Sequence, residues 1–124
     1  MGIIARLLGS GQKAADNGSE EHAVIVSITL ADQWPTDQER EELHALQDDL
    51  GAAIEAADAG ELDGDEWGEG ACTIYMYGPS ADHLWEAIAP VLEKRPFPKG
   101  SYARRRYGPP GTREDRVDLM WAGA

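Results

Sequence analysis

The chain has 124 residues, of which 42% are hydrophobic and 27% charged, and its formal net charge is −12. This length and composition predict one domain with a real core and exclude global disorder. An excess of 23 acidic over 11 basic side chains disfavours binding to nucleic acid, because phosphate contacts depend on lysine and arginine.

The cysteine and histidine content limits the kinds of site that are expected. Cys72 is the only cysteine, which excludes an intramolecular disulfide framework and a multi-cysteine metal centre. The three histidines fall in separate predicted elements without a ligand spacing, so we expect no metal site and no cofactor. A single cysteine and the lack of an apolar run of roughly 20 residues predict a cytoplasmic protein without a transmembrane segment.

The N-terminal segment differs from the remainder of the chain. Residues 1–8 (MGIIARLL) are apolar with one charge, and a glycine-rich, polar stretch follows. We predict a short apolar segment and a polar linker at residues 1–21, and a single α+β domain at residues 22–124. Residues 1–8 would either make a weak membrane or partner contact or fold onto the domain. Their short length and single cation favour the second interpretation.

A strand and a long helix are predicted first. Residues 22–30 (HAVIVSITL) are rich in β-branched side chains and almost continuously apolar, which indicates a buried strand. Thr36 is a favourable N-cap, and Glu39 three residues later completes a capping box. Apolar residues then recur at spacings of three and four, so we expect a helix that ends with Gly60 as its C-cap.

Residues 61–70 (ELDGDEWGEG) combine acidic side chains with glycines. We expect an acidic turn here, with a short irregular strand around residues 61–67. Carboxylates in a turn would suit a hard cation such as calcium. The spacing does not match an EF-hand loop, however, and this favours a solvated turn.

The second half of the chain predicts three strands and one helix. Period-two alternation at residues 71–77 indicates a strand, with Cys72 on its core face. A helix capped by Ser80 should follow, with a kink at Pro90. A loop precedes a strand at residues 102–107, and the turn 108–111 leads to a closing strand at residues 116–121.

This order of elements predicts a ferredoxin-like β-α-β-β-α-β sandwich, in which an antiparallel sheet carries two helices on one face and one extra C-terminal strand. Four spaced motifs follow along the chain: D-G-D-E-x-G-x-G at 63–70, Y-x-Y-G-x-x-A-D-x-L at 75–84, P-V-L at 90–92 and Y-G-P-P-G at 107–111. Together they resemble a group of small bacterial proteins with ferredoxin-like folds, and the resemblance implies this fold without an activity or site residues.

The strand face opposite the helices is the main candidate site. Tyr75 and Tyr77 should share this face, which would suit a partner protein, a second copy of the chain or a small ligand. The pattern fits equally well with a face that is covered by the chain's own N-terminal segment or by its extra strand. Arg104 and Arg106 should point the same way and would suit a carboxylate or phosphate, but protection of an edge strand and neutralisation of nearby acids are simpler roles.

The sequence therefore favours a non-catalytic protein-interaction or regulatory module, homodimeric through the open sheet face. One form would be an immunity protein, since an acidic surface suits a basic nuclease. The alternative is a small enzyme or ligand-binding protein with a site between the open face and the acidic turn 61–70. Its residues would be Tyr75, Tyr77, Arg104 and Arg106 for binding, with Asp63 or Glu66 for proton transfer.

Overall fold

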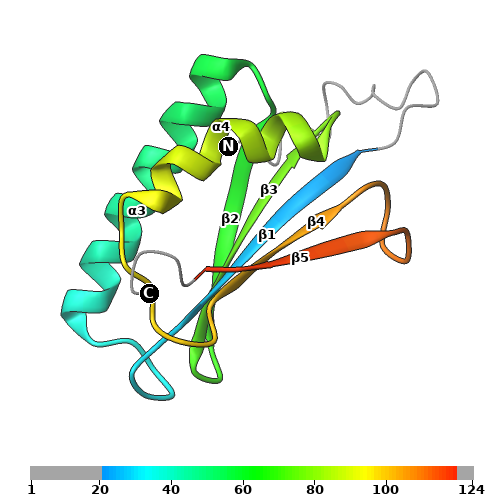
Figure 1. Cartoon of the computed structure of the whole chain (residues 1–124). Helices are drawn as coiled ribbons and strands as arrows, with labels where there is room; N and C mark the ends of the chain where they lie inside the picture. Colours follow the sequence, from blue (N-terminus) through cyan, green and yellow to red (C-terminus); the bar gives the residue numbers. More distant parts are fainter. Residues whose placement is uncertain (1–20, 120–124) are drawn as a thin grey trace.

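The structure is a computed structural model that describes residues 21–119 (Figure 1). The predicted N-terminal segment and the end of the predicted closing strand, residues 120–121, lie outside the described residues. Seven elements follow one another along the chain. They are β1 (His22–Thr29), α3 (Asp37–Ala57), β2 (Glu61–Gly68), β3 (Ala71–Gly78), α4 (Ala81–Glu93), β4 (Tyr102–Arg106) and β5 (Glu114–Asp118).

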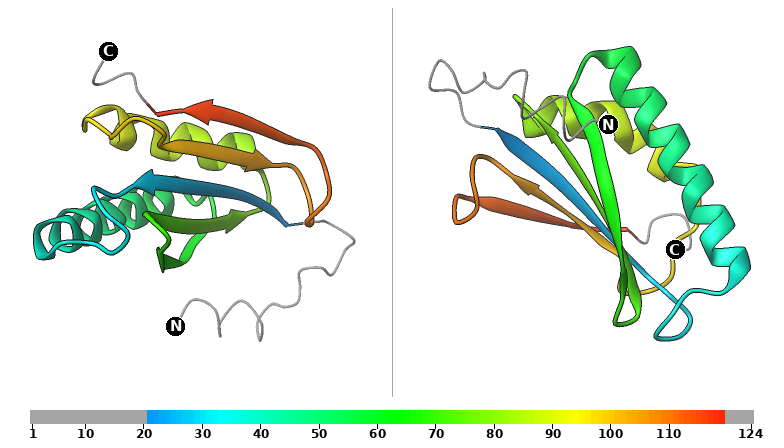
Figure 2. Two further views of the ribbon diagram at one scale, coloured as in Figure 1. Left: turned by 90° about the horizontal axis from the view of Figure 1, so that it is seen from below. Right: turned by 180° about the vertical axis from the view of Figure 1, so that it is seen from behind.

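The five strands form one sheet in the order β2-β3-β1-β4-β5, and all neighbouring strands are antiparallel. Both helices cover the same face of this sheet (Figure 2). The predicted α+β class with an antiparallel sheet is therefore confirmed. Among residues 21–119 there is no helix with the length and apolarity needed to cross a bilayer.

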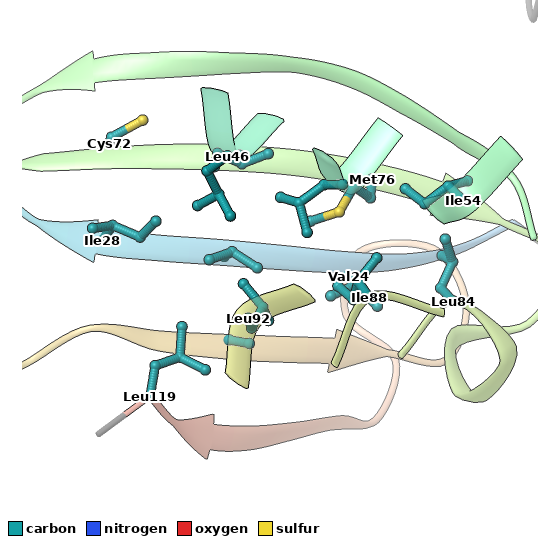
Figure 3. Packing of buried hydrophobic residues seen from close by; sticks show 14 of the residues in the cluster. Val24, Ile28, Leu46, Ile54, Cys72, Met76, Leu84, Ile88, Leu92 and Leu119 are labelled. Carbon is teal, nitrogen blue, oxygen red and sulfur yellow. The ribbon is translucent and has the colours of Figure 1, made fainter. Parts of the chain in front are cut away.

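The core lies between the sheet and the two helices (Figure 3). Alternate residues of β1 and β3 point to the helices, and Cys72 is fully buried among them, as predicted. Apolar stripes at helical spacing on α3 and α4 complete this core. Its main members are Val24, Val26 and Ile28 of β1, Ile74 and Met76 of β3, Leu46, Leu50 and Ile54 of α3, and Leu84, Ile88 and Leu92 of α4.

The predicted capping box at the start of α3 is confirmed. The Glu39 backbone N–H donates to the Thr36 hydroxyl at 3.0 Å, and the Thr36 backbone N–H donates to the Glu39 carboxylate at 2.9 Å. The same carboxylate accepts a hydrogen bond of 2.8 Å from the backbone N–H of Ala31. These backbone donors, that of Thr36 foremost, lower the pKa of Glu39.

We expect Thr36→Ala to lower the free energy of unfolding by about 1 kcal/mol in a urea titration, because an orphan N–H loses its acceptor. The pKa of Glu39 is lower in the folded protein than in the unfolded chain. The contribution of Glu39 to the free energy of unfolding is therefore present above its unfolded pKa and is lost as pH falls through its folded pKa. Glu39→Gln should therefore flatten the acid limb of the stability curve. Glu41→Gln, on an exposed position of the same helix, should leave that limb unchanged.

The helix ends differently from the prediction, which was wrong for Gly60. Its C-cap is Asp58, in the left-handed region at φ 52°, and the Ala59 N–H donates to the Ile54 carbonyl at 3.0 Å. Gly60 instead has φ 144°, and its backbone lies against Tyr77 and Gly78 of β3. Glycine is needed here for close approach of two backbones, a requirement that the local sequence does not reveal.

The short irregular strand predicted around residues 61–67 is confirmed, whereas the acidic turn predicted over residues 61–70 is much shorter than expected. Residues 61–68 form β2, which pairs with β3 from Glu61 opposite Tyr77 to Gly68 opposite Ala71. Only residues 69–70 form the turn. Pairing with β3 overrides the poor strand propensity of Asp and Gly, and a bulge between Leu62 and Gly64 disrupts the period-two pattern.

In the second half of the chain α4 includes Pro90, as predicted, and continues to Glu93. The closing strand differs from the prediction. The closing strand begins at Glu114, two residues earlier than predicted, and ends at Asp118. Pairing with β4 sets this register, with Arg104 opposite Arg116.

Candidate interaction surface on the sheet

The face of the sheet turned away from α3 and α4 carries most of the predicted site residues. The strand register places Ile25 of β1 between Tyr75 of β3 and Arg104 of β4. One pleat further along, Ala23 lies between Tyr77 and Arg106 in the same way. We call this surface the open face; its members used below are Ala23, Ile25, Glu66, Tyr75, Tyr77, Tyr102, Arg104, Arg106 and Arg116.

Short side chains on the central strand are enclosed by long ones on the open face. Ile25 is only 3% exposed and Ala23 is fully buried, whereas their register neighbours on β3 and β4 are half-buried. The long neighbours are tyrosines on one side and arginines on the other. The result is an apolar strip between a row of phenol rings and a row of guanidinium groups.

Tyr75 is held in place by an acidic neighbour. Its hydroxyl donates a hydrogen bond of 2.8 Å to a carboxylate oxygen of Glu66 on β2. Burial, together with this bond, raises the pKa of Tyr75. The phenol therefore remains protonated at neutral pH and serves as a fixed donor. Asp63, the other predicted acid, lies at the bulge of β2, outside the paired register.

Arg104 and Arg106 share the open face, and Arg105 points to the helix side, as the alternation predicts. Arg104 lies 3.5 Å from a Glu114 carboxylate oxygen, and its buried Nε has no hydrogen-bond partner. Nε of Arg106 donates to the Gly108 carbonyl at 2.9 Å. Within residues 21–119, these contacts use only some of the five N–H groups that each guanidinium carries.

The simpler roles suggested for these arginines are correct only in part. Arg104 and Arg105 do approach the carboxylates of Glu114 and Asp115, the second pair at 3.6 Å. The proposed protection of an edge strand is wrong, because β4 lies between β1 and β5. The extra strand β5 occupies the edge instead.

Two further residues extend the open face beyond the sequence-based prediction. The guanidinium carbon of Arg116 on β5 lies 3.8 Å from the centre of the Tyr102 ring on β4, a cation–π contact. Tyr102 stands two residues before Arg104, so strand alternation alone would have placed it on this face. Arg116 could not be placed without the register of β5.

An exposed tryptophan borders the open face at the far end of β2. Trp34 is 64% exposed and its ring lies against Gly68. It shares a shallow hollow with Glu66 and Thr73. A Cβ at position 68 would lie 3.5 Å from the indole, an ordinary contact, so the backbone conformation at φ 148° is what favours glycine here.

Away from the open face, a groove with a volume of about 430 Å³ lies between the first half of α3 and the loop after α4. Its lining includes Leu43, Phe97, Glu42 and Arg95. Within residues 21–119, no group of three or more His, Cys, Asp or Glu side chains is placed to hold a metal ion.

Comparison with known proteins adds no further assignment. No family model matches the chain, and neither a curated protein nor a solved structure matches it.

Proposed function

We propose that the protein is a non-catalytic interaction module that binds a protein partner through the open face. The observation that carries this proposal is a sheet face that no helix of residues 21–119 covers and that bears three of the chain's four tyrosines and three arginines. Tyr and Arg are enriched at protein interfaces and in their hot spots, whereas Lys is depleted. The open face has no lysine among its members.

We also propose that the fold is a ferredoxin-like sandwich with β5 added at one edge, in a cytoplasmic protein. The central position of β1 and β3, each followed by a helix that returns across the same face, supports this assignment. Within residues 21–119, both helices lie on the opposite face of the sheet from the open face. The resemblance to small bacterial ferredoxin-like proteins supports the same fold.

Photo-crosslinking in the native cells tests the interaction. Benzoylphenylalanine placed at Tyr77 in the full chain should give a discrete adduct on irradiation, because the open face meets its partner there. The same probe at Asp48, on an exposed position of α3, should give none. Equal yields at both positions would refute the proposal. So would a cross-link from position 77 to residues 1–20 of the same chain, since the chain would then cover its own face.

The alternative of a small enzyme is not favoured by a specific observation. Its proposed acids are Asp63 and Glu66, and Glu66 is already engaged with the Tyr75 hydroxyl. Proton transfer requires a base whose pKa is tuned for the task and whose lone pair can reach the substrate. A protonated Tyr75 that donates its hydrogen bond to the Glu66 carboxylate suits a binding surface better than a catalytic site.

A further inference from the structure

We infer that the partner on the open face is a second copy of this chain, packed face to face with its two-fold axis running along β1. This inference rests on the proposed interaction function and adds the identity and orientation of the partner. It is argued from the distribution of rings and charges on either side of β1.

The open face is divided by its central strand. β1 is the middle of the five strands, with β3 on one side and β4 on the other. On the β3 side the register positions next to β1 hold Tyr75 and Tyr77. On the β4 side the matching positions hold Arg104 and Arg106. At the positions next to β1, the face therefore presents tyrosine rings on the β3 side and guanidinium groups on the β4 side.

Two packed sheets related by a two-fold axis can be aligned in two ways. If the axis runs along the strands, β1 lies over β1 and the β3 of each copy lies over the β4 of the other. Tyr75 then meets Arg104 of the second copy, which forms a cation–π pair. If the axis runs across the strands, Arg104 meets its own equivalent, and such like-charge contacts are unfavourable. The face is thus self-complementary only in the first alignment.

The remaining residues are compatible with this arrangement. Ile25 and Ala23 lie along the axis but are buried beneath their longer neighbours, so the tyrosine and arginine side chains make the contact between the two sheets, which normally pack about 10 Å apart. Carboxylates of the outer strands, such as Glu66 and Asp118, oppose acidic residues in either alignment and do not distinguish them. Twist carries the ends of outer strands of packed sheets apart, which weakens those contacts.

A charge-reversal series tests both the partner and the orientation. Native mass spectrometry and light scattering of the full-length wild type should give a dimer. Arg104→Glu places a carboxylate over the Tyr75 ring, and Tyr75→Arg places a cation over Arg104; each single change should raise the dimer Kd about tenfold or more. The double variant pairs the introduced guanidinium of one copy with the introduced carboxylate of the other across the axis, and it should restore a Kd near that of the wild type.

The controls separate this inference from the proposed function. Lys99→Glu, in the exposed loop after α4, should not change the Kd, and far-UV circular dichroism should show that each variant is folded. If Arg104→Glu does not fold, Arg106→Glu tests the same row. A wild type that stays monomeric, or a double variant without recovery, would overturn the inference. If the Tyr77 cross-link then captures a different protein, the interaction function survives and only the self-association fails.

Discussion

Replacing Gly60 with alanine should lower the free energy of unfolding by about 3 kcal/mol or more, a large part of the roughly 5–15 kcal/mol typical of a domain. A Cβ at this position would overlap the Tyr77 carbonyl oxygen, and φ is 144°. Both the clash and the backbone conformation oppose the substitution. Gly78→Ala should act through the clash alone, because its new Cβ would overlap the Ala59 carbonyl oxygen.

Gly51 provides the matched control for these two glycines. It lies within α3, and nothing in the described residues comes within 4 Å of a Cβ built there. Gly51→Ala should therefore raise the free energy of unfolding by about 0.5–1 kcal/mol, since alanine favours the helix. Urea titrations of the three variants measure all of these changes. If Gly60→Ala proves neutral, the close approach of the α3–β2 connection to β3 is wrong.

The second large effect concerns the single thiol. Burial, with a smaller contribution from the charge of Asp65, raises the pKa of Cys72 to about 12. At pH 8 only about one native molecule in ten thousand would then carry the reactive thiolate. We expect no reaction with a disulfide reagent such as Ellman's reagent in buffer and one equivalent in concentrated urea. Rapid reaction of the folded protein would show that β3 opens readily or that Cys72 is accessible.

The same pKa predicts a loss of stability at high pH. The pKa of Cys72 is about 12 in the folded protein and near 8.5 in the unfolded chain. The buried thiol therefore contributes fully to the stability of the fold below about pH 8.5, and this contribution declines as pH rises toward about 12. The slope should approach about 1.4 kcal/mol per pH unit. In Cys72→Ala this slope should disappear between about pH 8.5 and 10. The pKa values of Tyr75 and Tyr107 are also raised, but these tyrosines affect stability only above about pH 10. An equal slope in both proteins would exclude Cys72 as its source.

Elements whose sequence contains a complete short-range pattern were predicted correctly. The capping box at Thr36 and Glu39 and the alternation around Cys72 are short-range patterns, and both are confirmed. β2 was predicted only as a short irregular strand, because its strand character comes from pairing with β3 and not from its own Asp- and Gly-rich sequence. Gly60 was misassigned for a similar reason: the backbone that it contacts is 17 or more residues away in the chain.

The candidate site could be predicted only as far as alternation extends. Tyr75 and Tyr77 lie two residues apart on one strand, and Arg104 and Arg106 lie two residues apart on another. Each pair was therefore correctly placed on one face. The juxtaposition of the two pairs about Ile25 depends on the sheet order, which brings β3 and β4 to the two sides of β1. The hydrogen bond from Tyr75 to Glu66 depends further on the register of β2.

The two edges of the sheet restrict how copies of the molecule can meet. β2 carries several carboxylates and a bulge, and β5 is a five-residue strand with three acidic side chains. Like charge and irregular backbone on exposed strands oppose the addition of further strands from a neighbouring chain. Ribbon-like growth by strand addition at either edge is thereby disfavoured.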